Sequence, residues 1–134
     1  MALLSPEEAI CGRLKAVTAV TNVLSQRIFP QDATHDSTLP HAVYQRTDSE
    51  TQQTLSASSR LTQYSIDVEV FAKTKTELHT AGVAVVGALQ GWKDLTKGVQ
   101  GCFHKSSTVQ AESDEGVYSI THTFALWQKP VEAA

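Results

Sequence analysis

Hydrophobic residues recur along the chain with two different periods, which predict two helices and four strands. The first helix is expected from Ser5 to Val20, because Ser5 and Glu8 match a capping box and apolar residues follow at helical spacing. The second helix is expected from Lys75 to Gln90, behind a capping box that begins at Thr74. Each helix therefore has one apolar stripe to bury.

The four strands are expected as two hairpins. Leu61 to Ala72 shows the clearest strand pattern, because its apolar and polar residues alternate with a period of two. Its partner is expected at His41 to Thr47, and the other hairpin at Gly98 to Gln110 and Tyr118 to Trp127. The resulting order, α-β-β-α-β-β, predicts an α+β fold in which two helices pack on one face of a four-stranded antiparallel sheet.

Length and composition indicate a single globular domain. The chain has 134 residues, of which we expect 1–127 to form the domain and 128–134 a flexible C-terminal tail. The formal charge of −3 argues against a protein that binds nucleic acid through bulk positive charge. Cys11 and Cys102 cannot build a disulfide framework or a four-ligand zinc site, so they are expected to be small buried thiols. We expect a soluble cytosolic protein, because neither a secretory signal nor a membrane-spanning apolar run is visible.

The chemically active side chains do not form a complete catalytic or metal site. His104 and His122 are expected almost opposite each other in the last hairpin, where they could share a metal ion, but no carboxylate completes the ligand set. Asp67 and Glu69 lie on one face of a strand, about 7 Å apart, a spacing compatible with glycoside chemistry. A solvated strand face, or ion pairs to a neighbouring subunit, is the simpler interpretation. We therefore expect no cofactor, no metal and no enzymatic activity.

Four aromatic residues fall on predicted strands and could form a stacking platform for nucleic acid. Few basic residues accompany them, so packing in the core or at an interface is the better interpretation. These residues are Tyr64, Tyr118, Phe124 and Trp127.

The segment from Asp48 to Arg60 is unusually long for a connection in a compact domain. It is rich in Ser, Thr and Gln, contains neither Gly nor Pro, and has one apolar residue, Leu55. Two interpretations remain open: a surface loop, or a hairpin arm that projects and contacts a partner. In the second, the contact residues are Gln52, Gln53, Thr54 and Leu55.

Several motifs, taken in order, resemble the tail-completion, or tail-terminator, family of long-tailed bacteriophages and phage-like particles. That family has an "R-I-[YF]-P" segment, an "L-P-x-x-V-Y-x-R" strand, a strand of the form "x-Q-x-x-[IV]-D-V-x-[VF]-[FW]-A" and a closing aromatic strand. The matching segments are Arg27–Pro30, Leu39–Arg46, Gln63–Ala72 and Phe124–Trp127. The resemblance covers most of Ile10 to Trp127, but segments 32–38 and 92–107 match none of the motifs.

The resemblance implies a structural role without catalysis. It implies subunits that close into a ring, expected to be hexameric, at the head-proximal end of the tail tube. Such a ring stops tube growth, contacts the tail tube protein and the head connector (adaptor or stopper) protein, and leaves a channel that DNA passes without specific binding. The implied location is the head–tail interface of the virion, after assembly in the host cytoplasm. In the ring, Asp67 and Glu69 are expected to pair with positive residues of a neighbour, with Arg46 and Lys73 as candidates.

A second interpretation is a small ferredoxin-like ligand-binding domain or enzyme, expected to be dimeric. Its basis is the duplicated α-β-β order, a layout that hosts many unrelated functions. A pocket that contains Asp67, Glu69 or His122, with a shifted pKa on one of them, would favour this interpretation. Flat or convex surfaces at these residues would count against it.

Overall fold

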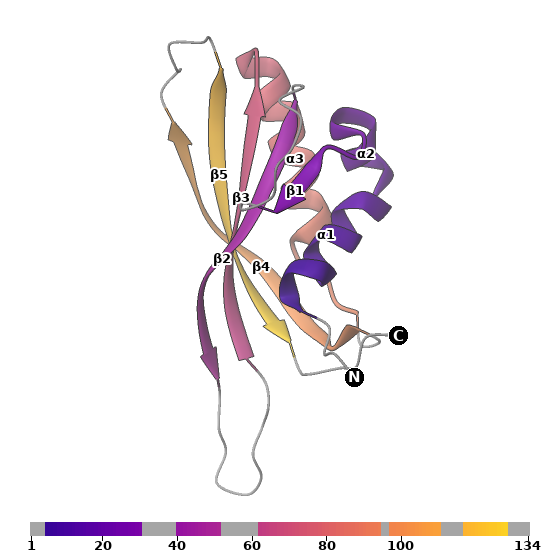
Figure 1. Cartoon of the computed structure of the whole chain (residues 1–134), viewed down its shortest axis with the longest axis vertical. Coiled ribbons are helices and arrows are strands. Elements are labelled where there is room, and N and C mark those ends of the chain that lie inside the picture. The colour runs from indigo at the N-terminus through magenta and orange to yellow at the C-terminus, as the bar shows by residue number, and fades with distance from the viewer. Residues whose placement is uncertain (1–4, 31–39, 52–61, 95–96, 111–116, 129–134) are drawn as a thin grey trace, which may run out of the picture.

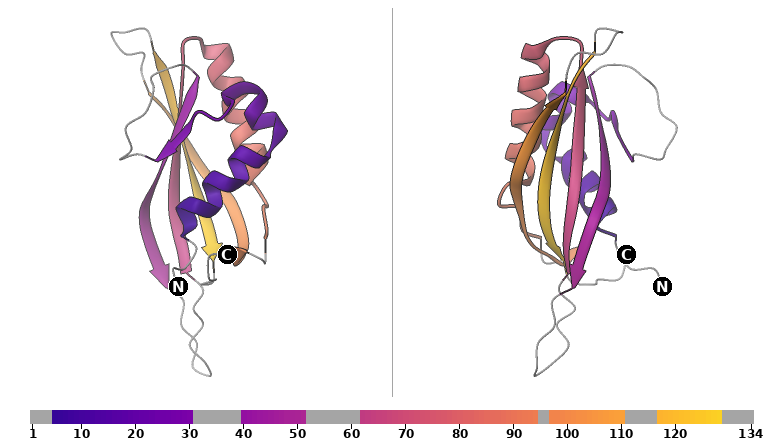
Figure 2. Two further views of the ribbon diagram at one scale, coloured as in Figure 1. Left: turned by 45° about the vertical axis from the view of Figure 1, so that its right-hand side comes forward. Right: turned by 90° about the vertical axis from the view of Figure 1, so that its left-hand side faces the viewer.

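The computed structural model describes residues 5–30, 40–51, 62–94, 97–110 and 117–128 of the chain. They form an α+β fold with a layer of helices on one face of a twisted sheet (Figures 1 and 2), as predicted. The helices and strands are α1 (Pro6–Ala16), α2 (Thr18–Leu24), β1 (Ile28–Pro30), β2 (His41–Thr51), β3 (Thr62–Ala72), α3 (Lys75–Leu89), β4 (Val99–Gln110) and β5 (Tyr118–Gln128).

The sheet has five strands in the order β1-β2-β3-β5-β4, so the prediction of four antiparallel strands is wrong in this detail. The four long strands pair antiparallel as expected, but the short strand β1 pairs in parallel with Ala42–Tyr44 of β2. A strand of three residues that ends at Pro30 is too short to show a period of two. Its pairing with β2 is a tertiary contact that the local sequence does not encode.

The predicted first helix is also divided in two. Val17 has an extended backbone (φ −87°, ψ 119°), which ends α1 and starts α2, and its carbonyl accepts hydrogen bonds from the N–H groups of Val20 and Thr21. Both halves bury apolar side chains, including Leu14 of α1 and Leu24 of α2. The break changes the direction of the chain at a β-branched residue, a type that a helix accommodates less well.

The two predicted helix starts are confirmed. The Ser5 hydroxyl accepts a hydrogen bond of 3.1 Å from the N–H of Glu8, and the Thr74 hydroxyl accepts one of 3.1 Å from the N–H of Glu77. Each bond satisfies a backbone donor that the first turn of a helix leaves free. Gly91 follows α3 with a φ of 75°, a left-handed conformation that glycine adopts without strain.

The core lies between the helices and one face of the sheet. In β3, Ile66, Val68 and Val70 are fully buried on this face. α1 packs over β1 and β2, while α3 packs over β3 and β5. No helix in the described part of the chain lies on the opposite face, which we call the open face (Figure 2).

The last strand runs one residue beyond its predicted end. Gln128 belongs to β5, is buried, and donates a hydrogen bond of 3.0 Å from Nε2 to the carbonyl of Lys97. The domain therefore includes at least one residue of the predicted C-terminal tail. Residues 129–134 lie outside the described part of the chain.

Candidate functional site

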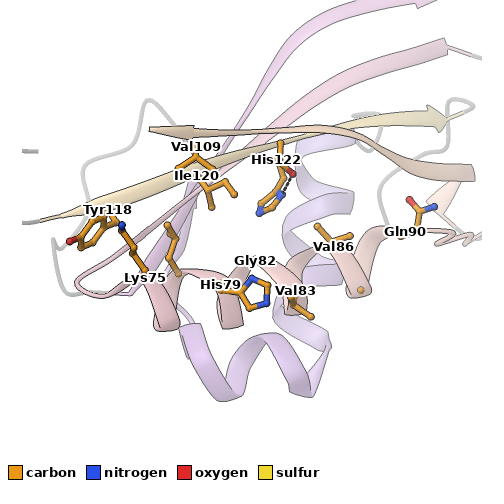
Figure 3. A pocket seen from close by; sticks show the side chains of 13 residues that line it. Lys75, His79, Gly82, Val83, Val86, Gln90, Val109, Tyr118, Ile120 and His122 are labelled. Carbon is orange, nitrogen blue, oxygen red and sulfur yellow. Dashed lines mark hydrogen bonds between the residues drawn. The ribbon is translucent and has the colours of Figure 1, made fainter. Parts of the chain in front are cut away.

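A groove of about 980 Å³ lies between α3 and the strands β4 and β5, on the helix-covered face of the sheet (Figure 3). Most of its lining surface is apolar. One wall is α3 with its C-cap residue, formed by Lys75, Leu78, His79, Gly82, Val83, Val86, Gly87 and Gln90. The other wall is the sheet, formed by Ser107, Val109, Tyr118, Ile120 and His122.

The groove is open because β4 is an edge strand and α3 is centred over β3 and β5. Val83 on α3 and Val109 on β4 are 59% and 72% exposed, although both are large apolar residues. Lys75, which lines one end of the groove, lies with its Nζ 5.7 Å from the centre of the Tyr118 ring. No Asp or Glu is among the lining residues that the structure describes, and these residues form an apolar surface with a positive charge at one end.

Two histidines and a serine form a hydrogen-bonded cluster in the sheet wall. The Nδ1 atom of His122 lies 2.8 Å from the hydroxyl oxygen of Ser107, which lies 3.0 Å from Nε2 of His104. The centroids of the two imidazole rings are 5.5 Å apart. In the strand register it is Ser107 that lies opposite His122, while His104 lies opposite Phe124, because an irregularity between His104 and Ser106 shifts the pairing.

The structure does not place a third ligand beside the two histidines among the described residues, as a metal site would need. Within the described part of the chain, no three His, Cys, Asp or Glu side chains come together in a group that could hold a metal ion. The hydroxyl of Ser107 lies between the two imidazoles instead.

His122 is 6% exposed, and its Nε2 atom is buried without a hydrogen-bond partner in the described structure. This nitrogen faces Gly82 of α3, where a methyl group built on the glycine would lie only 2.8 Å away. Burial lowers the pKa of His122 below its ordinary value, and the positive charge of His104 lowers this pKa further. The close contact with α3 thus rests on an uncharged imidazole and a residue without a side chain.

Asp67 and Glu69 lie away from the groove, on the open face. The register places Asp67 beside Thr123, whose hydroxyl donates a hydrogen bond of 2.8 Å to Oδ1 of the carboxylate. Burial raises the pKa of Glu69, a hydrogen bond with Ser119 lowers this pKa, and the charge of Asp67 raises it. The structure therefore separates the two carboxylates from His122: His122 is among the described residues that line the groove, and Asp67 and Glu69 are not.

The other predicted contact residues are spread over the molecule. Arg46 lies on the helix-covered side, where its Nε atom is 3.0 Å from Oε1 of Glu7 and its guanidinium lies 5.3 Å from the centre of the Tyr64 ring. Lys73 is exposed directly after β3. The predicted arm contacts, Gln52, Gln53, Thr54 and Leu55, lie outside the described residues.

The two cysteines are free, and only Cys102 is fully buried, whereas Cys11 is half-buried. Burial raises the pKa of the Cys102 thiol to about 12. We expect iodoacetamide at pH 8 to alkylate Cys11 in the native protein and to leave Cys102 unmodified until urea unfolds the chain, because the thiolate is the reacting form. Peptide mass spectrometry measures both sites, and equal labelling of both in the native protein would contradict the expectation.

The groove is the feature that sequence analysis missed. Gly82 is its best signal, since a glycine inside a strongly helical pattern often marks a close approach of another element. The strand that approaches Gly82 could not be known, because the β3–β5 pairing brings together segments far apart in the chain. None of the described helices is long and apolar enough to span a bilayer.

Comparison with known proteins gives one family and one fold. The model of the family described as tail completion protein gp17 matches residues 8–129. A search of curated proteins finds no match. Among solved structures, 31 chains match, and one is a chain from the virion of a native gene transfer agent particle. The superposition with this chain has a TM-score of 0.75 at 12% sequence identity, and covers 89% of our chain and 90% of the other.

Proposed function

Because the chain belongs to the tail completion protein gp17 family, and is thus a structural protein of a phage-type virion tail, we propose that it forms a ring at the head-proximal end of the tail tube. The proposed ring ends tube growth and joins the tail to an adaptor or stopper protein of the head connector. DNA passes through its channel without specific binding, and the protein performs no catalysis. The observation that carries this proposal is the family match over residues 8–129.

The partly open edges of the sheet support assembly from identical copies. In the described part of the chain, β4 has no strand on its outer edge, although segment 90–94 hydrogen-bonds to Val99, Cys102 and His104 in its first half. On the other edge, β1 covers only Ala42–Tyr44 of β2. The antiparallel pairings run from β2 through β3 and β5 to β4, so β2 and β4 point in opposite directions. A copy rotated about an axis along the strands would bring a β2 edge antiparallel to a β4 edge. Repeated head-to-tail contacts of this kind can close a ring, and we propose six copies.

The open face offers charged groups for contacts between copies. Asp67 and Glu69 are proposed to pair with positive residues of a neighbour, and exposed Lys73 is one candidate partner. Arg46 is the other candidate, but it would have to leave Glu7 of its own chain. Surface ion pairs of this kind contribute up to about 1 kcal/mol each, so they would select the register of the ring more than hold it together.

The segment between β2 and β3 is proposed to be the arm that contacts other tail or head components. We expect that deleting residues 51–58 leaves the free subunit folded but abolishes particle assembly. The subunit should still fold because the β2–β3 pairing between His41–Phe71 and Asp48–Ser65 remains. Thermal unfolding of the purified variant measures the first effect, and the yield of complete particles measures the second. Leu55→Asp is the matched single substitution and should impair docking without lowering the unfolding temperature. A normal yield from the deletion variant would refute the proposed arm.

Electron microscopy of purified tails with and without the protein tests the ring itself. We expect an added density at one end of tails that contain the protein, and tails of uncontrolled length without it. Solution mass should be measured both alone and with tail tubes, since the subunit could assemble only on the tube. A persistent monomer that binds neither tube ends nor connector protein would contradict the proposal.

The groove favours a second candidate function, that of a ligand-binding domain. It is lined by His122, whose pKa is lowered by burial, and this combination is one that a binding site would show. Asp67 and Glu69 lie outside it, so it does not combine the histidine with carboxylates. Screening a small-molecule fragment set by protein NMR tests this function, and the absence of shifts at groove residues would contradict it.

A further inference from the structure

The contact between α3 and the sheet contains a titratable group where β5 approaches Gly82. There the buried Nε2 atom of His122 faces Gly82 without a hydrogen-bond partner in the described structure. We propose that His122 makes this contact acid-sensitive: the uncharged imidazole lets α3 lie against β5, whereas protonation of Nε2 weakens this packing and opens the groove. The proposal is independent of whether the protein forms a ring.

The hydrogen-bond cluster determines which nitrogen of His122 carries the proton. Ser107 has a single hydroxyl proton and lies within hydrogen-bond distance of both His122 Nδ1 and His104 Nε2, so it can donate to only one of the two imidazoles. If Ser107 donated to His122, the N–H of the neutral ring would be at Nε2, pointing at α3 with no acceptor. The reverse arrangement, with His122 Nδ1–H donating to Ser107 and Ser107 donating to His104, leaves only a lone pair against Gly82. We infer this second arrangement, because a lone pair occupies less space than an N–H group.

Protonation of His122 then adds a hydrogen on the side of the ring that faces α3. A methyl group on Gly82 would already lie 2.8 Å from Nε2, so the two elements are in close contact here. The new N–H would be a buried charged donor without an acceptor, an arrangement that is costly in a protein interior. Movement of α3 away from the sheet would admit water to this donor.

Among the described residues that line the groove, no Asp or Glu compensates for the added proton. The charged or titratable groups toward it are His104 on β4 and Lys75 and His79 on α3, the last two at the groove. The carboxylates of the central strands, Asp67 and Glu69, lie on the opposite face of the sheet. Burial and the charge of His104 lower the pKa of His122 from its ordinary value of 6.5, which agrees with this geometry.

The sign of the pH effect follows from this shift. Above pH 6.5 the imidazole is neutral in both the folded and the unfolded chain, so it causes no change in stability with pH. As the pH falls below 6.5, the unfolded chain, or a state with α3 detached, takes up the proton more readily than the closed structure. The equilibrium for opening then rises by up to about tenfold per pH unit, until the folded chain is protonated as well.

Protein NMR on the full chain between pH 7.5 and 5 tests the proposal by two measurements. Imidazole ¹⁵N shifts should show that His122 carries its proton on Nδ1 at neutral pH. The midpoint of its titration should lie below pH 6.5. Hydrogen-exchange protection factors of α3 amides should fall by up to about tenfold per pH unit below that value. His122→Gln should remove this dependence, and His79→Gln, which changes an exposed histidine of the same groove, should retain it.

The proposal is overturned if His122 titrates at 6.5 or above, or if His122→Gln and the unsubstituted protein lose α3 protection equally. Should His122→Gln fail to fold, the ¹⁵N titration and the exchange of the unsubstituted chain decide the question. A midpoint below 6.5 with no change in α3 protection would also refute it, because the histidine would then be buried without controlling the helix.

Discussion

Replacing Gly82 with alanine is expected to reduce the free energy of unfolding by about 1–3 kcal/mol relative to Gly87→Ala, a substitution in the same helix. A methyl group at Gly82 would lie 2.8 Å from His122 Nε2 and 3.4 Å from its Cε1, so either the imidazole or α3 must move. The imidazole is hydrogen-bonded to Ser107 and is buried, so it has little freedom to move. Overpacking of this kind typically costs about 1–3 kcal/mol.

Gly87 provides the matched control, since no atom lies within 4 Å of a methyl group at that position. Both substitutions gain the same intrinsic preference of alanine for a helix, about 0.5–1 kcal/mol, so their difference isolates the steric effect. Urea unfolding followed by circular dichroism measures both variants. Equal stability of the two would show that α3 does not approach the sheet as closely as the structure has it.

Phe124→Ala is expected to have the largest effect on stability, a loss of about 3–5 kcal/mol. Phe124 is among the largest side chains that are fully buried, and it lies on β5, in the interior of the sheet. Removing its ring leaves a cavity beside His104, whose ring centroid is 5.3 Å away. Small domains have only about 5–15 kcal/mol of net stability, so the variant should unfold at a much lower urea concentration.

Phe103→Ala is the control for this prediction. Phe103 lies on the neighbouring strand β4 and is 48% exposed, so its truncation should change the free energy of unfolding by less than about 1 kcal/mol. The same urea titration compares the two variants. A comparable loss from both substitutions would contradict the assignment of Phe124 to the core and Phe103 to the surface.

Local patterns in the sequence predicted most of the helices and strands. The polar caps at Ser5 and Thr74 fixed the starts of α1 and α3, and the alternation around Ile66 fixed which face of β3 is buried. The break at Val17 was not predictable, because the residues on both sides of it continue a helical apolar pattern. The strand β1 was missed for a different reason, since three residues are stabilised as a strand only by their contact with β2.

The candidate site was harder to predict than the fold. The closeness of His104 and His122 was predicted. The hydrogen bond between Ser107 and His122 was not, because it depends on an irregularity in β4 that the sequence pattern does not indicate. The groove arises from the position of α3 over the sheet, which is a property of the tertiary structure. The strand register places Asp67 on the open face and Arg46 on the helix-covered face, so a pair between them would have to join two different copies.

The strand order also has a consequence for how the chain folds. The hairpins β2–β3 and β4–β5 join neighbours in the sequence, and each can form by local contacts. They meet only at the β3–β5 pairing, which joins Thr62 to Gln128 at one end and places β4 at the outer edge. Closing a long loop costs chain entropy before any contact is gained, so this pairing is expected to be the slow step of folding. α3 connects the two hairpins, and its early formation would shorten the search for that pairing.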